Sequence, residues 1–215
     1  MAALLILQRQ PLREQEWLLD VFSESHGRLR LAASGRETPQ LLTLYSGHWA
    51  QDQDWPRVRL LEMQEPLAAS GTGLYCGLYL TELLCRLQPQ GEVAPALFAA
   101  LCDTLRGIAS GGLPDPWLRL FEIHLLKTLG YGVNWQQDYR GQALDPALHY
   151  RFVAREGLMP AAQGISGQDL LAFASGQPDP AAFAAAKQVL RVAIDNLLEK
   201  PLVSRELFQG LPDPQ

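Results

Sequence analysis

The sequence predicts an α+β protein in which a small β-barrel is followed by a mainly helical domain. Residues 1–65 contain short apolar runs and polar–apolar alternation, which are typical of strands. From Leu67 onward the apolar residues recur at the spacing of a helix. Hydrophobic residues make up 47% of the 215 positions and charged residues 19%, a composition that supports a packed core and excludes a disordered chain. We therefore expect one domain over residues 1–65 and another over 66–215.

The first domain contains five short segments with the character of strands. The segment 28–32 alternates polar and apolar residues, as a half-buried strand does. The preceding segment, 23–27, has the length of a hairpin connection and ends in glycine. Five strands within about sixty residues indicate a small barrel, and the OB-fold is the commonest such unit with a binding role. The expected strands are 4–7, 17–22, 28–32, 41–45 and 58–62.

The second domain carries several signals for the start of a helix. Asp115-Pro116 and Asp179-Pro180 each place an aspartate, whose side chain accepts from free amides, before a proline, which has no amide to satisfy. Ser204 is predicted to cap the last helix. The expected helices are 71–87, 94–108, 117–129, 181–198 and 205–211.

An irregular insert is expected at about residues 131–165, because no helical period continues there. A short hairpin is predicted within it around residues 149–153. Ser166, followed three residues later by Asp169, resembles a capping box and predicts that a helix begins there.

The residues that bind metals do not fall into any ligand pattern. The three cysteines, Cys76, Cys85 and Cys102, are an odd number without CxxC spacing, which fits neither a disulfide framework nor a zinc site. We predict that they are buried free thiols. The four histidines also lack ligand spacing. No metal and no cofactor are therefore expected.

Motifs of catalysis are also missing from the sequence. It contains no GxxxxGK[ST], GxSxG or HExxH motif. The stretch 71–77 reads GxGxxxG, one residue too long for a dinucleotide fingerprint. No apolar run approaches the roughly 18 residues of a membrane span, and the first residues lack the basic region of a signal peptide. These observations predict a cytoplasmic binding protein that is not an enzyme and does not enter the membrane.

The charge distribution leaves two interpretations open. The net charge of −5 argues mildly against nucleic acid. However, Arg28 and Arg30 lie two apart on a predicted strand, so they share a face and would be able to follow a phosphate backbone. Arg9, Arg13 and Arg36 would extend this track. The alternative is a solvated sheet face that binds no ligand.

Four stretches, in this order along the chain, together resemble the RecO family of bacterial DNA-repair proteins. They are LQRQPLRE at 7–14 with WLLDVFSESHGRLRL at 17–31, GLYLTELL at 77–84, LRLFEIHLLKTLGYG at 118–132, and KPLVSREL at 200–207. The resemblance implies an N-terminal OB-fold, a helical C-terminal domain and a recombination mediator. Such a mediator binds single- and double-stranded DNA, anneals complementary strands, and acts in the cytoplasm at the nucleoid. It partners RecR and the single-stranded-DNA-binding protein (SSB), and it helps to load RecA.

The chain departs from the family pattern in two places. Some relatives carry a four-cysteine zinc module after the LGYG stretch, whereas residues 131–165 contain no cysteine, so a zinc module is not expected. Relatives also tend to carry a basic segment after the third strand, whereas residues 34–40 are short and contain one base.

The resemblance also implies a site for the acidic, phenylalanine-ended tail of SSB. The family arginine that matches Arg119 lies beside a hydrophobic groove, and a guanidinium can donate two parallel hydrogen bonds to a terminal carboxylate. A cation near the start of a helix gains nothing from the helix dipole, so Arg119 is not explained as a helix-stabilising residue. Lys187 and Arg191, one turn apart, would add positive charge. The alternatives are an ordinary surface arginine and, for the whole protein, an adaptor between proteins without nucleic-acid contact.

Overall fold

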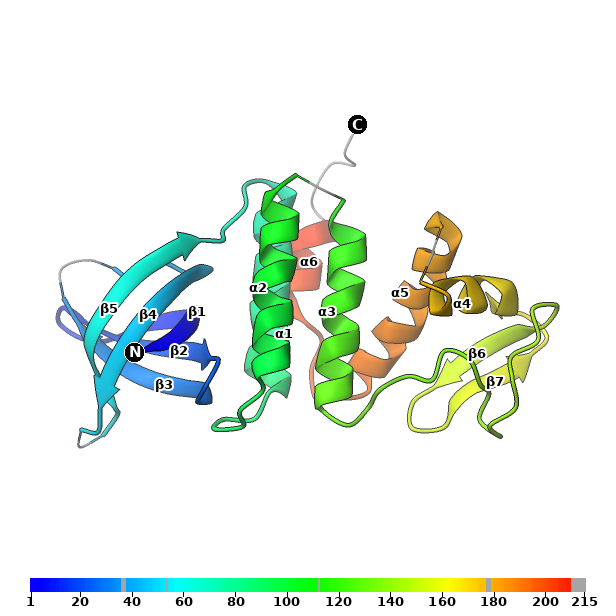
Figure 1. Ribbon diagram of the computed structural model, residues 1–215, viewed down its shortest axis with the longest axis horizontal. Helices are drawn as coiled ribbons and strands as arrows, with labels where there is room; N and C mark the ends of the chain where they lie inside the picture. Colours follow the sequence, from blue (N-terminus) through cyan, green and yellow to red (C-terminus); the bar gives the residue numbers. More distant parts are fainter. Residues whose placement is uncertain (36–37, 53, 112, 177–178, 210–215) are drawn as a thin grey trace. The chain divides into compact units, whose positions relative to one another are not determined.

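The computed structural model describes residues 1–35, 38–52, 54–111, 113–176 and 179–209 (Figure 1). The chain divides into two compact units, one formed by Met1–Pro114 with Leu202–Gln215 and the other by Asp115–Pro201. The domain boundary predicted at residue 65 falls inside the first unit, where the strands end and the helices begin. Arg36, which the sequence placed in the basic track, lies outside the described residues.

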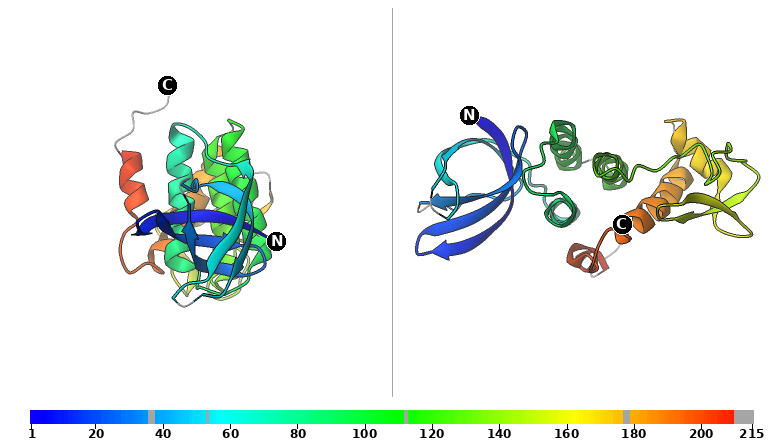
Figure 2. Two further views of the ribbon diagram at one scale, coloured as in Figure 1. Left: turned by 90° about the vertical axis from the view of Figure 1, so that its left-hand side faces the viewer. Right: turned by 90° about the horizontal axis from the view of Figure 1, so that it is seen from below.

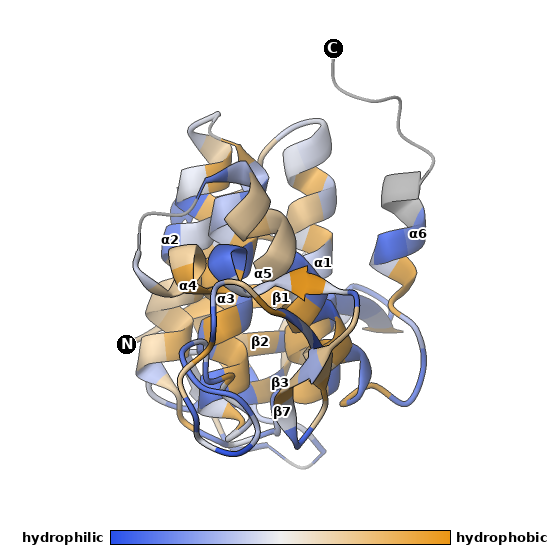
Figure 3. Cartoon of the chain, turned by 90° about the vertical axis from the view of Figure 1, so that its right-hand side faces the viewer, coloured by the Kyte–Doolittle hydropathy of each residue, from blue (hydrophilic) through white to orange (hydrophobic). Residues whose placement is uncertain are grey.

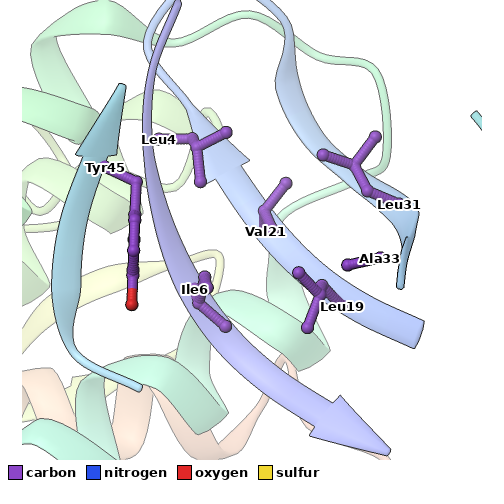
Figure 4. Packing of buried hydrophobic residues seen from close by; sticks show 7 residues of the cluster. All are labelled: Leu4, Ile6, Leu19, Val21, Leu31, Ala33 and Tyr45. Atoms are coloured by element: carbon purple, nitrogen blue, oxygen red, sulfur yellow. The ribbon is translucent and has the colours of Figure 1, made fainter. Parts of the chain in front are cut away.

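A closed five-stranded barrel begins the first unit, with strand order β1-β2-β3-β5-β4. Figure 2 shows it from two further sides in blue and cyan. This confirms the predicted α+β class with an OB-like barrel in front of a helical region. The barrel interior is filled by apolar side chains from four strands (Figure 4): Leu4, Ile6, Leu19, Val21, Leu31, Ala33 and Tyr45. The strands are β1 (Ala2–Arg13), β2 (Glu16–Ser23), β3 (Gly27–Ser34), β4 (Thr43–Ala50) and β5 (Arg57–Pro66).

All five strands are longer than predicted, and the bounds of β1 and β4 have a structural reason. β1 continues well past the predicted end at residue 7 and includes Pro11. Its pairing with β4 covers only Ala2 to Leu5, so the later residues of β1 have one neighbouring strand, and a proline without an N–H is tolerated there. β4 begins at Thr43 rather than at residue 41, because Leu42 has a left-handed backbone with φ of 52°.

Helices α1 (Thr72–Leu87) and α2 (Pro95–Ala109) of the first unit follow the barrel. Successive residues of β2 point to opposite faces, so one set enters the barrel and the other faces the helices. Phe22 belongs to the second set, and its ring centroid lies 5.8 Å from that of Phe98 in α2. Gly27, at the start of β3, has φ of 66°, and a Cβ there would lie 2.1 Å from the Glu92 carbonyl oxygen. The barrel and the α1–α2 connection therefore meet too closely for a side chain.

The last helix, α6 (Val203–Gln209), lies against α1 in the first unit. The prediction that Ser204 caps this helix is wrong, because Ser204 lies inside the helix and is buried. The carboxylate of Glu82 in α1 instead accepts hydrogen bonds from the backbone N–H groups of Val203, at 3.0 Å, and Ser204, at 2.8 Å. The distant carboxylate thus satisfies the amides that a local cap would have taken.

In its described residues, the second unit combines three helices and irregular segments with a small sheet of order β7-β6-β8. The hairpin predicted near residue 150 is confirmed. The predicted starts of two helices are also confirmed, because Asp169 N–H donates to the Ser166 hydroxyl at 3.4 Å and Ala182 N–H donates to the Asp179 carboxylate at 2.8 Å. The elements are α3 (Pro114–Thr128), β6 (His149–Val153), β7 (Gly157–Ala161), β8 (Ile165–Ser166), α4 (Gly167–Ala174) and α5 (Pro180–Asp195).

Two features are absent from the described ranges. No helix in this part of the chain is both long and apolar enough to cross a bilayer. No three or more histidine, cysteine, aspartate and glutamate side chains there are grouped so as to hold a metal ion.

Candidate nucleic-acid and peptide sites

The barrel surface carries a small polar hollow, which we call the barrel hollow. Strand register places Gln8, Asp20 and Arg30 in one row across β1, β2 and β3. The hollow has a volume of about 60 Å³ and is lined by Gln8, Arg9, Gln10, Leu18, Asp20 and Arg30. Pairing of the three strands thus brings together two arginines and three other polar side chains that are far apart in the sequence.

Arg28 has a structural role at the edge of this hollow. Its guanidinium donates to both carboxylate oxygens of Asp20, at 2.9 and 3.0 Å, and to the backbone carbonyl of Gln88 at 2.9 Å. The Arg28 side chain is only 11% exposed. Burial alone would lower the pKa of Arg28, but the hydrogen bonds and charge of Asp20 raise it above its ordinary value. Arg28 therefore links the barrel to the end of α1. Its charge is paired with that of Asp20 and is largely buried.

Arg30 and Arg9 keep their charges at the rim of the barrel hollow. Arg30 is 39% exposed, lies 3.7 Å from Asp20, and places its guanidinium carbon 5.8 Å from the centre of the Trp55 ring. Arg9 lies at the same distance from the Trp17 ring and donates to the carbonyl of Pro39. Arg9 makes no ion pair with any described residue. Because Arg28 already neutralises Asp20, the hollow has an excess of positive charge.

The other described arginines of the barrel, Arg13, Arg57 and Arg59, differ in their ion pairs. Arg13 is 67% exposed and 3.5 Å from Asp54, a solvated pair of the kind that stabilises little. Arg57 is held between two carboxylates, Glu16 at 2.9 Å and Asp52 at 2.8 Å, as the lowered pKa of Glu16 also indicates. Arg59 is exposed and, within the described ranges, has no ion-pair partner.

Arg59 was missed by sequence reasoning. It lies on β5, two residues beyond the point where Arg57 pairs with Ala32 of β3. That pairing closes the barrel and joins segments far apart along the chain, so no local pattern around Arg59 predicts its place near the third strand.

Arg119 lies in the second unit and is buried rather than on the surface. Its Nη2 donates to Glu122 Oε1 at 3.0 Å, and the two side chains are 7% and 1% exposed. The Nε atom of Arg119 is buried without a hydrogen-bond partner among the described residues. A buried donor without a partner is uncommon, because leaving it unpaired costs free energy.

The two α5 cations predicted beside Arg119 lie in the same part of the second unit. Lys187 Nζ is 3.3 Å from both carboxylate oxygens of Asp115, which is one helical turn before Arg119 on α3. Arg191, one turn beyond Lys187, lies 3.8 Å from Asp195. Both ion pairs are exposed to solvent, so they stabilise the positions of the Lys187 and Arg191 side chains only weakly.

Exposed apolar side chains accompany these charges. Leu120 is 50% exposed on α3, next to Arg119, and Val192 is 44% exposed on α5, next to Arg191. The surface of the second unit therefore presents both apolar area and cations, the two features that an acidic peptide with an aromatic end would need.

Comparison with known proteins places the chain. The family profile described as "Recombination protein O C terminal" matches residues 69–206. The DNA repair protein RecO of Azoarcus sp. (strain BH72) is 36% identical, over 96% of this chain and 93% of the relative. The chain belongs to the RecO family. The proteins of the same name from Pseudomonas aeruginosa (strain LESB58) and Aliivibrio fischeri (strain MJ11) are 36% and 32% identical over 95% and 94% of this chain, and 93% and 92% of each relative.

The RecO family relatives extend over both parts of the fold. The profile begins three residues before α1 and ends within α6, so it covers the helical region and the insert. The individual RecO proteins align with almost the whole chain and therefore include the barrel. The resemblance proposed from four sequence stretches is confirmed, and the protein is a DNA-repair protein of the RecO family.

Proposed function

We propose that this RecO protein is a recombination mediator and not an enzyme. It binds single- and double-stranded DNA, anneals complementary strands, and engages the SSB tail and RecR so that RecA is loaded. It acts in the cytoplasm, at the nucleoid during repair. The observation that carries the proposal is the barrel hollow, where Arg9 and Arg30 keep their charge while Arg28 neutralises the one carboxylate.

Phosphate binding follows from the charges of the hollow. Arg9 and Arg30 each offer several N–H donors to phosphate oxygens, and neutralising phosphates releases counterions. Trp55, beside Arg30, supplies an aromatic face of the type on which unpaired bases stack. Arg13, whose contact with Asp54 is weak, and Arg59, which has no described ion pair, extend the charged surface.

The test is a salt-titrated anisotropy measurement with a labelled single-stranded oligonucleotide. The double variant Arg9→Ala/Arg30→Ala should bind more weakly, and its slope of log affinity against log salt should fall by about 1.4 if each arginine contacts one phosphate. Arg106→Ala is the matched control, because Arg106 is exposed, pairs with Glu65 and does not line the hollow. A protein that acts only as an adaptor between proteins would not bind the oligonucleotide at any salt concentration.

The SSB tail is proposed to bind at Arg119, Lys187 and Arg191. An acidic peptide would replace Asp115 as the partner of Lys187, and its terminal carboxylate would accept from the Nε donor of Arg119. The phenylalanine ring would lie on the apolar area that includes Leu120. Titration of a labelled tail peptide, with and without its final phenylalanine, tests this part of the proposal independently of DNA.

A further inference from the structure

We propose that the tip of the β6–β7 hairpin in the second unit is a second binding site for single-stranded nucleic acid. It is distinct from the barrel hollow, and we call it the hairpin site. Phosphates would contact Arg151 and Arg155, and a base would stack on Tyr139 beside Arg140. The inference rests on the proposed function only in that the protein binds single-stranded DNA.

Alternation along the hairpin gives its outer face a positive charge. β6 and β7 pair in register from His149–Ala161 to Val153–Gly157. Tyr150 and Leu158 are buried and belong to the core of the second unit. Arg151, on the opposite face of β6, is exposed. It has no ion-pair partner among the described residues, so its guanidinium is available to an anion.

Arg155 is held at the turn of the hairpin in an unusual conformation. Its φ is 68°, in the left-handed region that glycine and asparagine adopt more readily than arginine. The residue is exposed and, within the described ranges, makes no ion pair. Local folding would be easier with glycine, so the arginine is explained better by what its side chain binds than by the turn itself.

An aromatic side chain lies against the same tip. Tyr139 N–H donates to the Leu158 carbonyl at 2.9 Å, and Tyr139 Cα lies 3.9 Å from where a Cβ on Gly157 would be. The Tyr139 side chain is exposed, and the Arg140 guanidinium lies 4.9 Å from its ring centre. An exposed ring next to arginines is the combination that binds unpaired bases and their phosphates.

The carboxylate of Asp138, close to Tyr139, is held by its own turn. Asp138 Oδ1 accepts from the N–H groups of Arg140 and Gln142. Glu156, beside Arg155, is exposed and is the one acidic side chain of the turn itself. Figure 3 shows hydrophilic segments next to β7. Three arginines, Arg140, Arg151 and Arg155, therefore face two carboxylates, Asp138 and Glu156, so positive charge is in excess around the exposed ring of Tyr139.

The test weakens the barrel site first, so that the contribution of the hairpin site is a larger share of the remaining binding. The full chain with Arg9→Ala/Arg30→Ala is compared with the same chain carrying Arg151→Ala/Arg155→Gly as well, using a labelled oligothymidine. Glycine is chosen at 155 because it suits the positive φ, so the turn is preserved. The residual binding should fall about tenfold or more, and the salt slope by about 1.4 for two phosphate contacts.

Two further variants sharpen the result. Lys127→Glu removes the same two units of charge from an exposed position on α3 and should leave binding unchanged. Tyr139→Ala should weaken binding with no change in salt slope, because stacking does not release counterions. In the wild-type background, Arg151→Ala/Arg155→Gly should also slow the annealing of two complementary oligonucleotides.

The outcomes separate this inference from the proposed function. If wild type binds oligothymidine and the hairpin variants match Lys127→Glu in affinity, slope and annealing, the hairpin site is overturned while the mediator proposal stands. If the hairpin variants lose affinity for polyglutamate but not for oligothymidine, the tip binds an acidic peptide and the inference is wrong. If wild type binds no single-stranded DNA, both proposals fail.

Discussion

Two buried arginine–carboxylate pairs, one in each compact unit, look alike until their hydrogen bonds are compared. Arg28 and Asp20 are 11% and 9% exposed and lie 2.9 Å apart, and Arg119 and Glu122 are 7% and 1% exposed and lie 3.0 Å apart. Arg28 makes three hydrogen bonds, two of them to both oxygens of its partner. Arg119 contacts one oxygen of Glu122, and its Nε has no hydrogen-bond partner in the part of the chain that the structure describes.

The difference separates an arginine that completes the fold from one that has capacity left for a ligand. A guanidinium with its donors satisfied gains little from a new partner, because an existing bond must break first. An unsatisfied buried donor gains a hydrogen bond when a ligand arrives, without losing one. The hydrogen bonds of Arg28 therefore support a structural role, and the incomplete ones of Arg119 are the basis for proposing that it binds a ligand.

The largest effect is expected from Arg28→Ala. The change leaves the Asp20 carboxylate buried without its main partner and the Gln88 carbonyl without its donor. Breaking a buried pair in this way typically costs about 3–5 kcal/mol of unfolding free energy. Urea denaturation followed by circular dichroism measures it.

A second variant shows whether the loss comes from the stranded carboxylate. Asp20→Leu/Arg28→Met removes both charges and should recover much of the stability, because apolar residues often replace buried pairs without penalty. The thiol of Cys85 can report on unfolding. Burial raises its pKa to about 12, so alkylation at neutral pH is suppressed in the folded protein. A loss below about 1 kcal/mol for Arg28→Ala would show that the pair is not structural.

The next largest effect is expected from Arg119→Ala on the affinity for the SSB tail peptide. Loss of a charge-assisted hydrogen bond costs about 1.5–3 kcal/mol, or roughly 10- to 150-fold in affinity. The variant also removes the buried ion pair between Arg119 and Glu122, so unfolding free energy should fall as well. Anisotropy with a labelled tail peptide, with thermal unfolding in parallel, measures both.

Removing both members of the pair separates recognition from stability. Arg119→Met/Glu122→Gln should unfold close to wild type and still fail to bind the peptide. Arg119→Lys should restore only part of the affinity, because lysine cannot donate two parallel hydrogen bonds. Binding by the double variant within twofold of wild type would place the site elsewhere.

Glu82 extends the comparison to a carboxylate that is bound mainly by backbone. Burial raises its pKa, but hydrogen bonds from Ser204 and Val203 and the charge of Arg86 outweigh burial, so the pKa lies below its ordinary 4.5. A depressed carboxylate pKa stabilises the folded state at pH values above the unfolded pKa, and this contribution is lost as pH falls through the folded pKa. Glu82→Gln should cost about 1 kcal/mol at pH 7.

The pH dependence provides the check on this prediction. Wild type and Glu82→Gln should converge in unfolding free energy as the pH is lowered past the folded pKa, because both then carry an uncharged side chain. A difference that is constant from pH 7 to acid would mean that charge on Glu82 does not hold α6.

The smallest effect on stability is expected from Arg30→Ala. Arg30 is 39% exposed and lies 3.7 Å from Asp20, so its loss should change unfolding free energy by less than about 1 kcal/mol. For this variant, the slope of log affinity for single-stranded DNA against log salt should nevertheless fall by about 0.7. A large loss of unfolding free energy with an unchanged salt slope would show that Arg30, like Arg28, has a structural role and does not contact DNA.

The sequence predicts what depends on local period and local caps. The strands, the helices and the caps at Ser166 and Asp179 follow from spacing, because each depends on neighbours along the chain. The roles of the arginines do not follow. Alternation on β3 gives Arg28 and Arg30 the same face, but the Gln88 carbonyl that captures Arg28 is 60 residues away. A position near the start of a helix does not explain a cation at Arg119, because the helix dipole favours anions there. The burial of Arg119 depends on packing that no local pattern encodes.

The division of the first unit between the two ends of the chain has a consequence for synthesis on the ribosome. Residues after Leu202 complete a unit whose other members end at Pro114, with the whole of Asp115–Pro201 made in between. Ser204, whose amide binds Glu82, lies 122 residues later in the chain. Synthesis of that stretch takes about 6–24 s at roughly 5–20 residues per second. During that interval the second unit is being synthesised, and the face of α1 that receives α6 is uncovered. A ribosome that stalls before residue 202 would therefore leave the first unit without α6.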